Sequence, residues 1–103
     1  MGDFRAVARA TEIPSGEMKL VDLDGEKVVV ANVNGTFLAF GNTCTHVGGP
    51  LEEGDLDGET VVCPWHASVF DIRSGEPLGG PAEESIPIYE VQVAGDEIRV
   101  RKP

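Results

Sequence analysis

Two short segments carry the most information in this chain: Cys44-Thr45-His46 and, sixteen residues later, Cys63-Pro64-Trp65-His66. Together they contain both cysteines and both histidines of the 103 residues. Thiolate and imidazole ligands suit zinc or an iron–sulfur cluster far better than magnesium or calcium. Because each segment pairs one cysteine with one histidine, two loops can each deliver one sulfur and one nitrogen ligand to a shared metal centre.

Two other interpretations use the same residues. A structural zinc site is chemically reasonable, although zinc proteins more often pair two cysteines or two histidines within one arm. A disulfide between Cys44 and Cys63 would leave both histidines without a role, and a single bridge is unusual in a cytosolic protein. The mixed spacing therefore favours an iron–sulfur cluster, with zinc as the alternative.

The rest of the chain has the pattern of short antiparallel strands. Alternating apolar residues and turn signals predict strands over 4–8, 18–22, 27–33, 36–40, 59–63, 68–72, 86–93 and 97–101. Asp24-Gly25 and Asn34-Gly35 are typical of tight hairpin turns. No segment has a helical period, and residues 11–16 leave room for one helical turn. These patterns predict a small all-β domain with residues 42–81 inserted into it.

The charge of the chain is strongly negative, −10 in total. Residues 44–80 hold seven carboxylates and a single basic residue, Arg73, so the excess lies on the segment with the cysteines and histidines. This charge argues against nucleic acid or an anionic membrane as a partner and favours a basic protein. No apolar run approaches the ~20 residues of a membrane span, and the first residues lack the apolar core of a signal peptide. We therefore expect a soluble, cytoplasmic protein.

Several residues around the second cysteine–histidine segment carry a resemblance to a known family. Residues 63–71 (CPWHASVFD) and 73–76 (RSGE) resemble the second ligand loop of bacterial Rieske-type ferredoxins, and residues 79–82 (GGPA) are similar to that family's proline-containing loop. The resemblance implies the Rieske fold, an all-β fold of three small antiparallel sheets with an inserted cluster-binding subdomain. Residues 1–103 would then form a single domain, with a β body over 1–41 and 82–103 and a cluster-binding lobe over 42–81.

The same resemblance implies the cofactor and its ligands. In a Rieske [2Fe-2S] centre, two thiolates bind one iron and two imidazoles bind the other. The expected cofactor is one such cluster per chain, with Cys44 and Cys63 on one iron and His46 and His66 on the other. Four protein ligands and the bridging sulfides fill both irons, so no position remains open for a substrate. We therefore expect an electron-transfer component and not an enzyme.

The resemblance also implies the partners. It predicts a soluble monomeric ferredoxin that passes single electrons from a flavin-dependent reductase to a terminal oxygenase, without nucleic acid or membrane. One alternative is the small subunit of a nitrite reductase-like complex, and another is a zinc-stabilised structural domain.

Three further residues near the predicted ligands carry expectations. Ser68 matches the serine whose hydroxyl bonds the cluster in high-potential Rieske proteins, whereas Phe70 replaces their tyrosine. Trp65, between two predicted ligands, is expected to shield the cluster or to pack against the opposite loop, with a docking role as the alternative.

Overall fold

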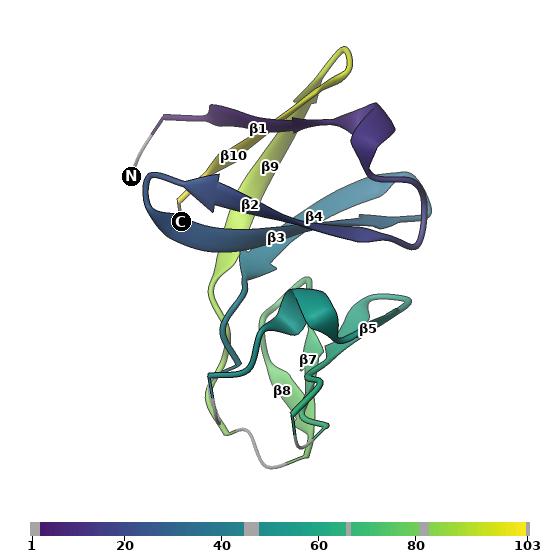
Figure 1. Cartoon of the computed structure of the whole chain (residues 1–103), viewed down its shortest axis with the longest axis vertical. Helices are drawn as coiled ribbons and strands as arrows, with labels where there is room; N and C mark the ends of the chain where they lie inside the picture. The colour runs from purple at the N-terminus through teal and green to yellow at the C-terminus, as the bar shows by residue number, and fades with distance from the viewer. Residues whose placement is uncertain (1–2, 45–47, 66, 81–82, 103) are drawn as a thin grey trace.

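The computed structural model describes residues 3–44, 48–65, 67–80 and 83–102, and in these residues it is built almost entirely of β-strands (Figure 1). The strands are β1 (Arg5–Arg9), β2 (Met18–Leu23), β3 (Glu26–Val33), β4 (Thr36–Gly41), β5 (Asp55–Asp57), β6 (Thr60–Val62), β7 (Val69–Asp71), β8 (Pro77–Gly79), β9 (Ile88–Ala94) and β10 (Glu97–Arg101). Two short 3₁₀ turns accompany them, η1 (Ala10–Glu12) and η2 (Leu51–Glu53). No helix of the described residues is long and apolar enough to cross a membrane.

Three antiparallel sets of strands make up the fold. One set contains β1, β10 and β9, and the next contains β2, β3 and β4. They join where β4 pairs with β9 at Ala39–Tyr89 and Phe40–Ile88, which gives the order β1-β10-β9-β4-β3-β2. The third set, β5-β6-β7-β8, lies beyond one end of this body (Figure 1). The predicted all-β architecture of antiparallel sheets is confirmed.

The predicted hairpin turns are also present. Asp24 and Gly25 both have positive φ, as do Asn34 and Gly35. Two successive residues of this kind make the turn whose twist matches that of the flanking strands, and asparagine, aspartate and glycine adopt it at the least cost. These turns fix the register of β2, β3 and β4, so that Val30 lies opposite Ala39 and Lys19.

Three elements were not predicted: η2, β5 and β8. Each spans three residues. The strands contain Asp55, Asp57, Pro77 and Gly79, which have low strand propensity. They are strands because β6 and β7 offer them hydrogen-bonding edges.

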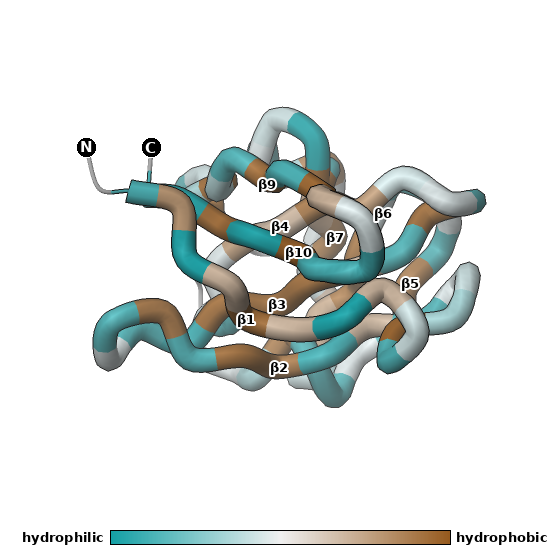
Figure 2. Tube along the Cα trace, turned by 90° about the horizontal axis from the view of Figure 1, so that it is seen from above, coloured by the Kyte–Doolittle hydropathy of each residue, from teal (hydrophilic) through white to brown (hydrophobic). Residues whose placement is uncertain are grey.

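Strand β3 is buried on both faces and separates two hydrophobic clusters. Val28 and Val30 pack into the cluster between the strands of the body, whereas Val29 and Ala31 pack into a cluster shared with the third sheet. In Figure 2 the hydrophobic colour runs along β3 through the centre of the molecule. The shared cluster is built from the following buried residues: Val29, Ala31, Phe40, Cys44, Leu51, Val61, Cys63, Phe70, Ile72 and Ile86. The predicted cysteine ligands therefore lie in the hydrophobic core.

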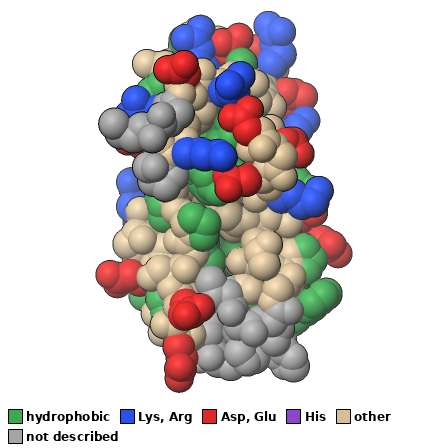
Figure 3. All heavy atoms as spheres, turned by 90° about the vertical axis from the view of Figure 1, so that its left-hand side faces the viewer, with side chains coloured by type: hydrophobic (Ala, Val, Ile, Leu, Met, Phe, Trp, Pro, Cys, Tyr) green, Lys and Arg blue, Asp and Glu red, His purple; other side chains and the backbone are tan. Residues whose placement is uncertain are grey.

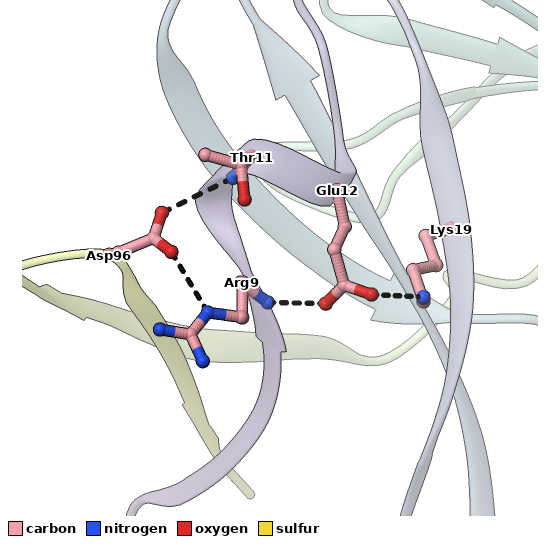
Figure 4. A network of polar contacts seen from close by, with 5 residues as sticks. All are labelled: Arg9, Thr11, Glu12, Lys19 and Asp96. Carbon is pink, nitrogen blue, oxygen red and sulfur yellow. Dashed lines mark hydrogen bonds and ion pairs between the residues drawn. The ribbon is translucent and has the colours of Figure 1, made fainter.

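A polar network holds the end of β1 against its neighbours (Figure 4). The Asp96 carboxylate accepts hydrogen bonds from Arg9 Nε at 3.0 Å and from the Thr11 backbone N–H at 3.3 Å. Glu12 accepts the Arg9 backbone N–H at 2.7 Å and pairs with Lys19 Nζ at 3.0 Å. The Arg9 N–H and then Lys19 hold the pKa of Glu12 below its usual value. This network ties β1 to the β9–β10 turn and to β2.

Within the body, Gly41 at the end of β4 lies in close contact with Pro87, the residue before β9. The Gly41 N–H donates to the Pro87 carbonyl at 2.9 Å. A Cβ atom on Gly41 would lie 2.7 Å from Pro87 Cγ and 3.0 Å from Cδ. A proline ring cannot turn away as a flexible side chain can, so only glycine fits here without a shift of the backbone.

We predict that Gly41→Ala lowers the free energy of unfolding by about 1–3 kcal/mol, the usual cost of overpacking. Denaturant unfolding followed by circular dichroism measures this change. The matched control is Gly79→Ala, because a Cβ at Gly79 meets nothing within 4 Å. Equal free energies of unfolding for the two variants would contradict the proposed steric constraint.

Candidate metal centre

The two predicted cysteine ligands come together in the structure from different elements. Cys44 follows β4 after two linking residues, and Cys63 directly follows β6. Both are buried, with exposed fractions of 1% and 2%, and both are free thiols in the shared hydrophobic cluster. The other two predicted ligands, His46 and His66, lie outside the described residues. The two predicted sulfur ligands thus lie next to each other, and their role as ligands stays a prediction.

The surroundings of Cys63 act on the pKa of its thiol in opposite directions. Burial raises the pKa of the Cys63 thiol, and the neighbouring Cys44 thiol raises it further by hydrogen bonding and charge. The backbone N–H of Trp65, 3.4 Å from Cys63 Sγ, acts in the opposite direction. Metal-binding thiols are deprotonated, and a bound cation supplies the positive charge that a buried thiolate needs. A pair of buried soft donors fits an iron–sulfur cluster or zinc, and in the described residues no group of three or more histidine, cysteine or acidic side chains forms a rival site.

The first loop is closed at its base by backbone hydrogen bonds. The Cys44 N–H donates to the Gly49 carbonyl at 2.9 Å, and the Gly48 N–H donates to the Cys44 carbonyl at 2.8 Å. Thr43 and Pro50 form an isolated antiparallel bridge just outside these bonds. Gly48 has a φ of +74°, which glycine adopts without strain. The loop therefore returns on itself within a few residues of Cys44.

The second loop links two paired strands, β6 and β7. The Cys63 N–H donates to the Ser68 carbonyl at 2.8 Å, which closes the loop at its base. Ala67 has a φ of +57°, an uncommon value for a residue with a side chain. Ser68 is fully buried, so it is not a solvent-facing strand residue. The expected bond from its hydroxyl to a cluster stays a prediction.

The two loops approach each other at Gly49. A Cβ atom on Gly49 would lie 2.9 Å from Cys63 Sγ and 3.1–3.2 Å from atoms of the Trp65 ring. Glycine at position 49 therefore permits the backbone of the first loop to lie close to the Cys63 sulfur. Trp65 packs against the opposite loop, as predicted, yet 51% of its surface is exposed. Phe70 is a core residue of the shared cluster.

A further contact, which no sequence pattern predicted, supports the second loop. A Cβ atom on Gly80 would lie 2.7 Å from the Ser68 Cα and 3.0 Å from the Ala67 carbonyl oxygen. Gly80 also has a φ of +81°, so both its conformation and its surroundings require glycine. The backbone after β8 is thereby seated directly on the loop that follows Cys63.

The charge of the molecule is distributed unevenly over its two parts. Figure 3 shows one face, on which lysine and arginine side chains gather over the body, while the charged side chains visible on the lower part are acidic. Arg73, the single base of residues 44–80, forms an ion pair with Glu59. Residues 44–80, which contain both cysteines, therefore carry a predominantly negative charge.

Comparisons with known proteins agree with this geometry. The family model described as the Rieske [2Fe-2S] domain matches residues 3–90. The biphenyl dioxygenase ferredoxin subunit of Pseudomonas sp. (strain KKS102) is 35% identical over 98 residues, which cover 94% of this chain and 90% of that protein. Human apoptosis-inducing factor 3 is 34% identical over 96 residues, but the chain spans only 16% of that protein's length.

Solved structures show the same likeness. The ferredoxin of carbazole 1,9a-dioxygenase from Nocardioides aromaticivorans IC177 superposes with a TM-score of 0.93 at 30% identity, covering 99% of this chain and 100% of that one. A chain in the complex of reduced oxygenase and oxidized ferredoxin in carbazole 1,9a-dioxygenase gives a TM-score of 0.89 at 32% identity, with 94% and 91% coverage.

We predict that Gly49→Ala weakens metal binding, because the added methyl group would displace Cys63 Sγ or the Trp65 ring. Changes to groups that position a metal ligand typically cost about 10–100-fold in metal affinity. Iron and sulfide are counted per chain after anaerobic reconstitution, and metal loss is followed in a chelator competition. Gly79→Ala, whose methyl group meets nothing within 4 Å, is the control. Equal metal content and equal chelator resistance in the two variants would show that the contact does not constrain the site.

Proposed function

Because this chain belongs to the family of Rieske [2Fe-2S] domains, we propose that it is a one-electron carrier with one [2Fe-2S] cluster, bound by Cys44, Cys63, His46 and His66. The observation that carries the proposal is the pair of buried free thiols that two loops bring together. The proposal treats residues 1–103 as a single domain, with a body over 1–41 and 82–103 and a lobe over 42–81.

In this proposal, some residues of the chain bind the [2Fe-2S] cluster and others keep water away from it. When bound, the cluster supplies reversible one-electron chemistry. Cys44 and Cys63 provide thiolates, and the Trp65 N–H stabilises the Cys63 sulfur. Leu51 and Phe70, both fully buried, exclude water from the thiolate side. Since four protein ligands complete the coordination, we propose a carrier of electrons and not a catalyst.

We propose a terminal oxygenase and a flavin-dependent reductase as the partners. Two observations support this choice. The relatives that match over most of their length are named as ferredoxin components of dioxygenase systems, and one superposed structure is a complex between such a ferredoxin and its oxygenase. The negative lobe also suits a basic surface on each partner, with docking that is transient and sensitive to salt. In this proposal the protein is a cytoplasmic monomer.

A second candidate is a fixed electron-transfer domain or subunit in a larger assembly, such as one resembling nitrite reductase. It is supported by relatives that the chain covers only in part, among them apoptosis-inducing factor 3 at 16% and a cytochrome b6-f iron-sulfur subunit at 54% of their lengths. Stable co-purification with a large partner would favour this candidate over a mobile carrier.

The first experiment is low-temperature EPR of the dithionite-reduced protein, with iron, sulfide and zinc counted on the same sample. We expect a rhombic signal together with two irons and two sulfides per chain, the content of one [2Fe-2S] cluster. The Cys63→Ser and His66→Ala variants are expected to lose it. An EPR-silent protein with about one zinc per chain would replace electron transfer with a structural role.

Salt dependence tests the proposed docking. We expect reduced protein to transfer electrons to the oxidised terminal oxygenase of carbazole 1,9a-dioxygenase with a rate constant that falls as ionic strength rises, because opposite charges steer the encounter. Stopped-flow absorption measures the rate. Glu52→Gln and Asp55→Asn together should reduce both the rate at low salt and its salt dependence, whereas Glu17→Gln with Asp22→Asn in the body is the control. Equal effects of the two pairs would contradict docking through the lobe.

A further inference from the structure

Asn42 is a buried polar residue two positions before Cys44, with an exposed fraction of only 6%. The segment that contains it leaves β4 and enters the loop of the predicted cysteine ligand. Buried polar side chains are normally held by hydrogen bonds, so the partners of Asn42 indicate what it does.

Three hydrogen bonds join Asn42 to other residues that the structure describes. Its backbone N–H donates to the Lys27 carbonyl of β3 at 3.2 Å, and its backbone carbonyl accepts the Leu51 N–H at 2.7 Å. Its side-chain Oδ1 accepts the Glu52 N–H at 2.9 Å. Asn42 therefore connects the body to η2, on the far side of the loop that contains Cys44.

The bonds to η2 replace a cap that the local sequence does not provide. The first N–H groups of any helical turn have no partner within the turn and need an outside acceptor. The residue at the N-cap is Pro50, and no side-chain capping bond is made there. Asn42 instead supplies both acceptors, its carbonyl for Leu51 and its side-chain oxygen for Glu52. It thus caps η2 from nine residues before the first residue of that turn.

The hydrogen bonds of Asn42 lie at the base of the first ligand loop, where its two ends come together. Residues 43 and 50 form the bridge, and Cys44 and Gly49 are hydrogen-bonded just inside it. Asn42 holds both ends of this loop: it is covalently next to residue 43, and it binds the two residues that follow residue 50. A shift of η2 would therefore move Gly49, whose backbone lies against Cys63 Sγ.

We infer that Asn42 is a positioning residue for the metal centre, whose side-chain oxygen holds the Cys44 loop in register with Cys63. The inference rests on the proposed function, since it assumes that Cys44 is a cluster ligand. Asn42 acts through the loop and is not itself a ligand in this proposal.

The chain offers a matched control in Asn32. This asparagine is buried to the same degree, with 7% exposed, and its side chain also accepts a backbone N–H, that of Gly35, at 2.8 Å. Its Nδ2 donates to the Ile13 carbonyl at 2.8 Å. These bonds lie within the body, so Asn32→Ala removes a comparable buried amide without touching the ligand loops.

The experiment compares holo Asn42→Ala, Asn42→Asp, Asn32→Ala and wild type by chelator-induced iron loss, reduction potential, EPR line shape and thermal unfolding. We expect both alanine variants to lose thermal stability. Only Asn42→Ala should also release iron faster, by about tenfold as for other residues that position ligands, with a broadened EPR spectrum and a changed potential. Asn42→Asp keeps an acceptor oxygen for the Glu52 N–H and should restore much of the chelator resistance.

The inference is overturned if Asn42→Ala and Asn32→Ala release iron at the same rate, or if Asn42→Asp is as labile as Asn42→Ala. Should Asn42→Ala not fold, Asn42→Ser replaces it, because serine keeps a polar group but is too short to reach the same N–H. A wild-type protein without an iron–sulfur cluster would overturn the proposed function itself and this inference with it, so the two failures are distinguishable.

Discussion

Two thiols must stay side by side in a hydrophobic environment, and much of the lobe is arranged to meet that requirement. Burial raises the pKa of Cys63, so the surroundings favour a neutral thiol and a bound cation reverses that preference. The space beside the Cys63 sulfur and in the second loop is also tightly restricted. Gly49 leaves no room for a single methyl group beside Cys63 Sγ, and Gly80 leaves none beside Ser68. The second loop is therefore in close contact with two other segments, the first loop at Gly49 and the backbone after β8 at Gly80.

The body packs against the cysteines through strand β3, which is buried on both faces. Val29 and Ala31 face the same cluster as the two cysteines, while Val28 and Val30 on the opposite face of β3 anchor the strand in the body. A strand buried on both faces cannot slip by one residue without exchanging its two hydrophobic sets. Consequently the register of β3 fixes the surface on which the lobe packs. Misalignment in the body would be transmitted directly to the thiols.

The features that sequence reasoning found were those with local signals. Asparagine–glycine and aspartate–glycine turns specify hairpins through their own backbone preferences, and a cysteine spaced from a histidine signals a ligand loop.

The missed elements lack such signals. Asp55 and Asp57 disfavour a strand, and β5 forms only because β6 lies beside it. The hydrogen bond between Asn42 and Glu52 could not be predicted either, because the two residues are ten positions apart and a buried asparagine has no sequence pattern of its own. Close approaches such as Gly80 to Ser68 depend on how separate strands pack, which no local pattern reports.

The body and the lobe also differ in how their charged residues are paired. The body pairs most of its basic residues with carboxylates: Arg5 with Asp24, Lys19 with Glu12, and Lys102 with Glu26. The described lobe has one such pair, Arg73 with Glu59, so its other carboxylates are not neutralised by basic residues of the lobe. Unpaired like charges repel one another and cost stability in a compact sheet of three-residue strands. Such a cost is tolerable where buried contacts hold the chain, and the unneutralised carboxylates leave residues 44–80 with a net negative charge. The charge that weakens the isolated lobe is thus also what would attract a positively charged partner to the half-exposed Trp65 beside the thiols.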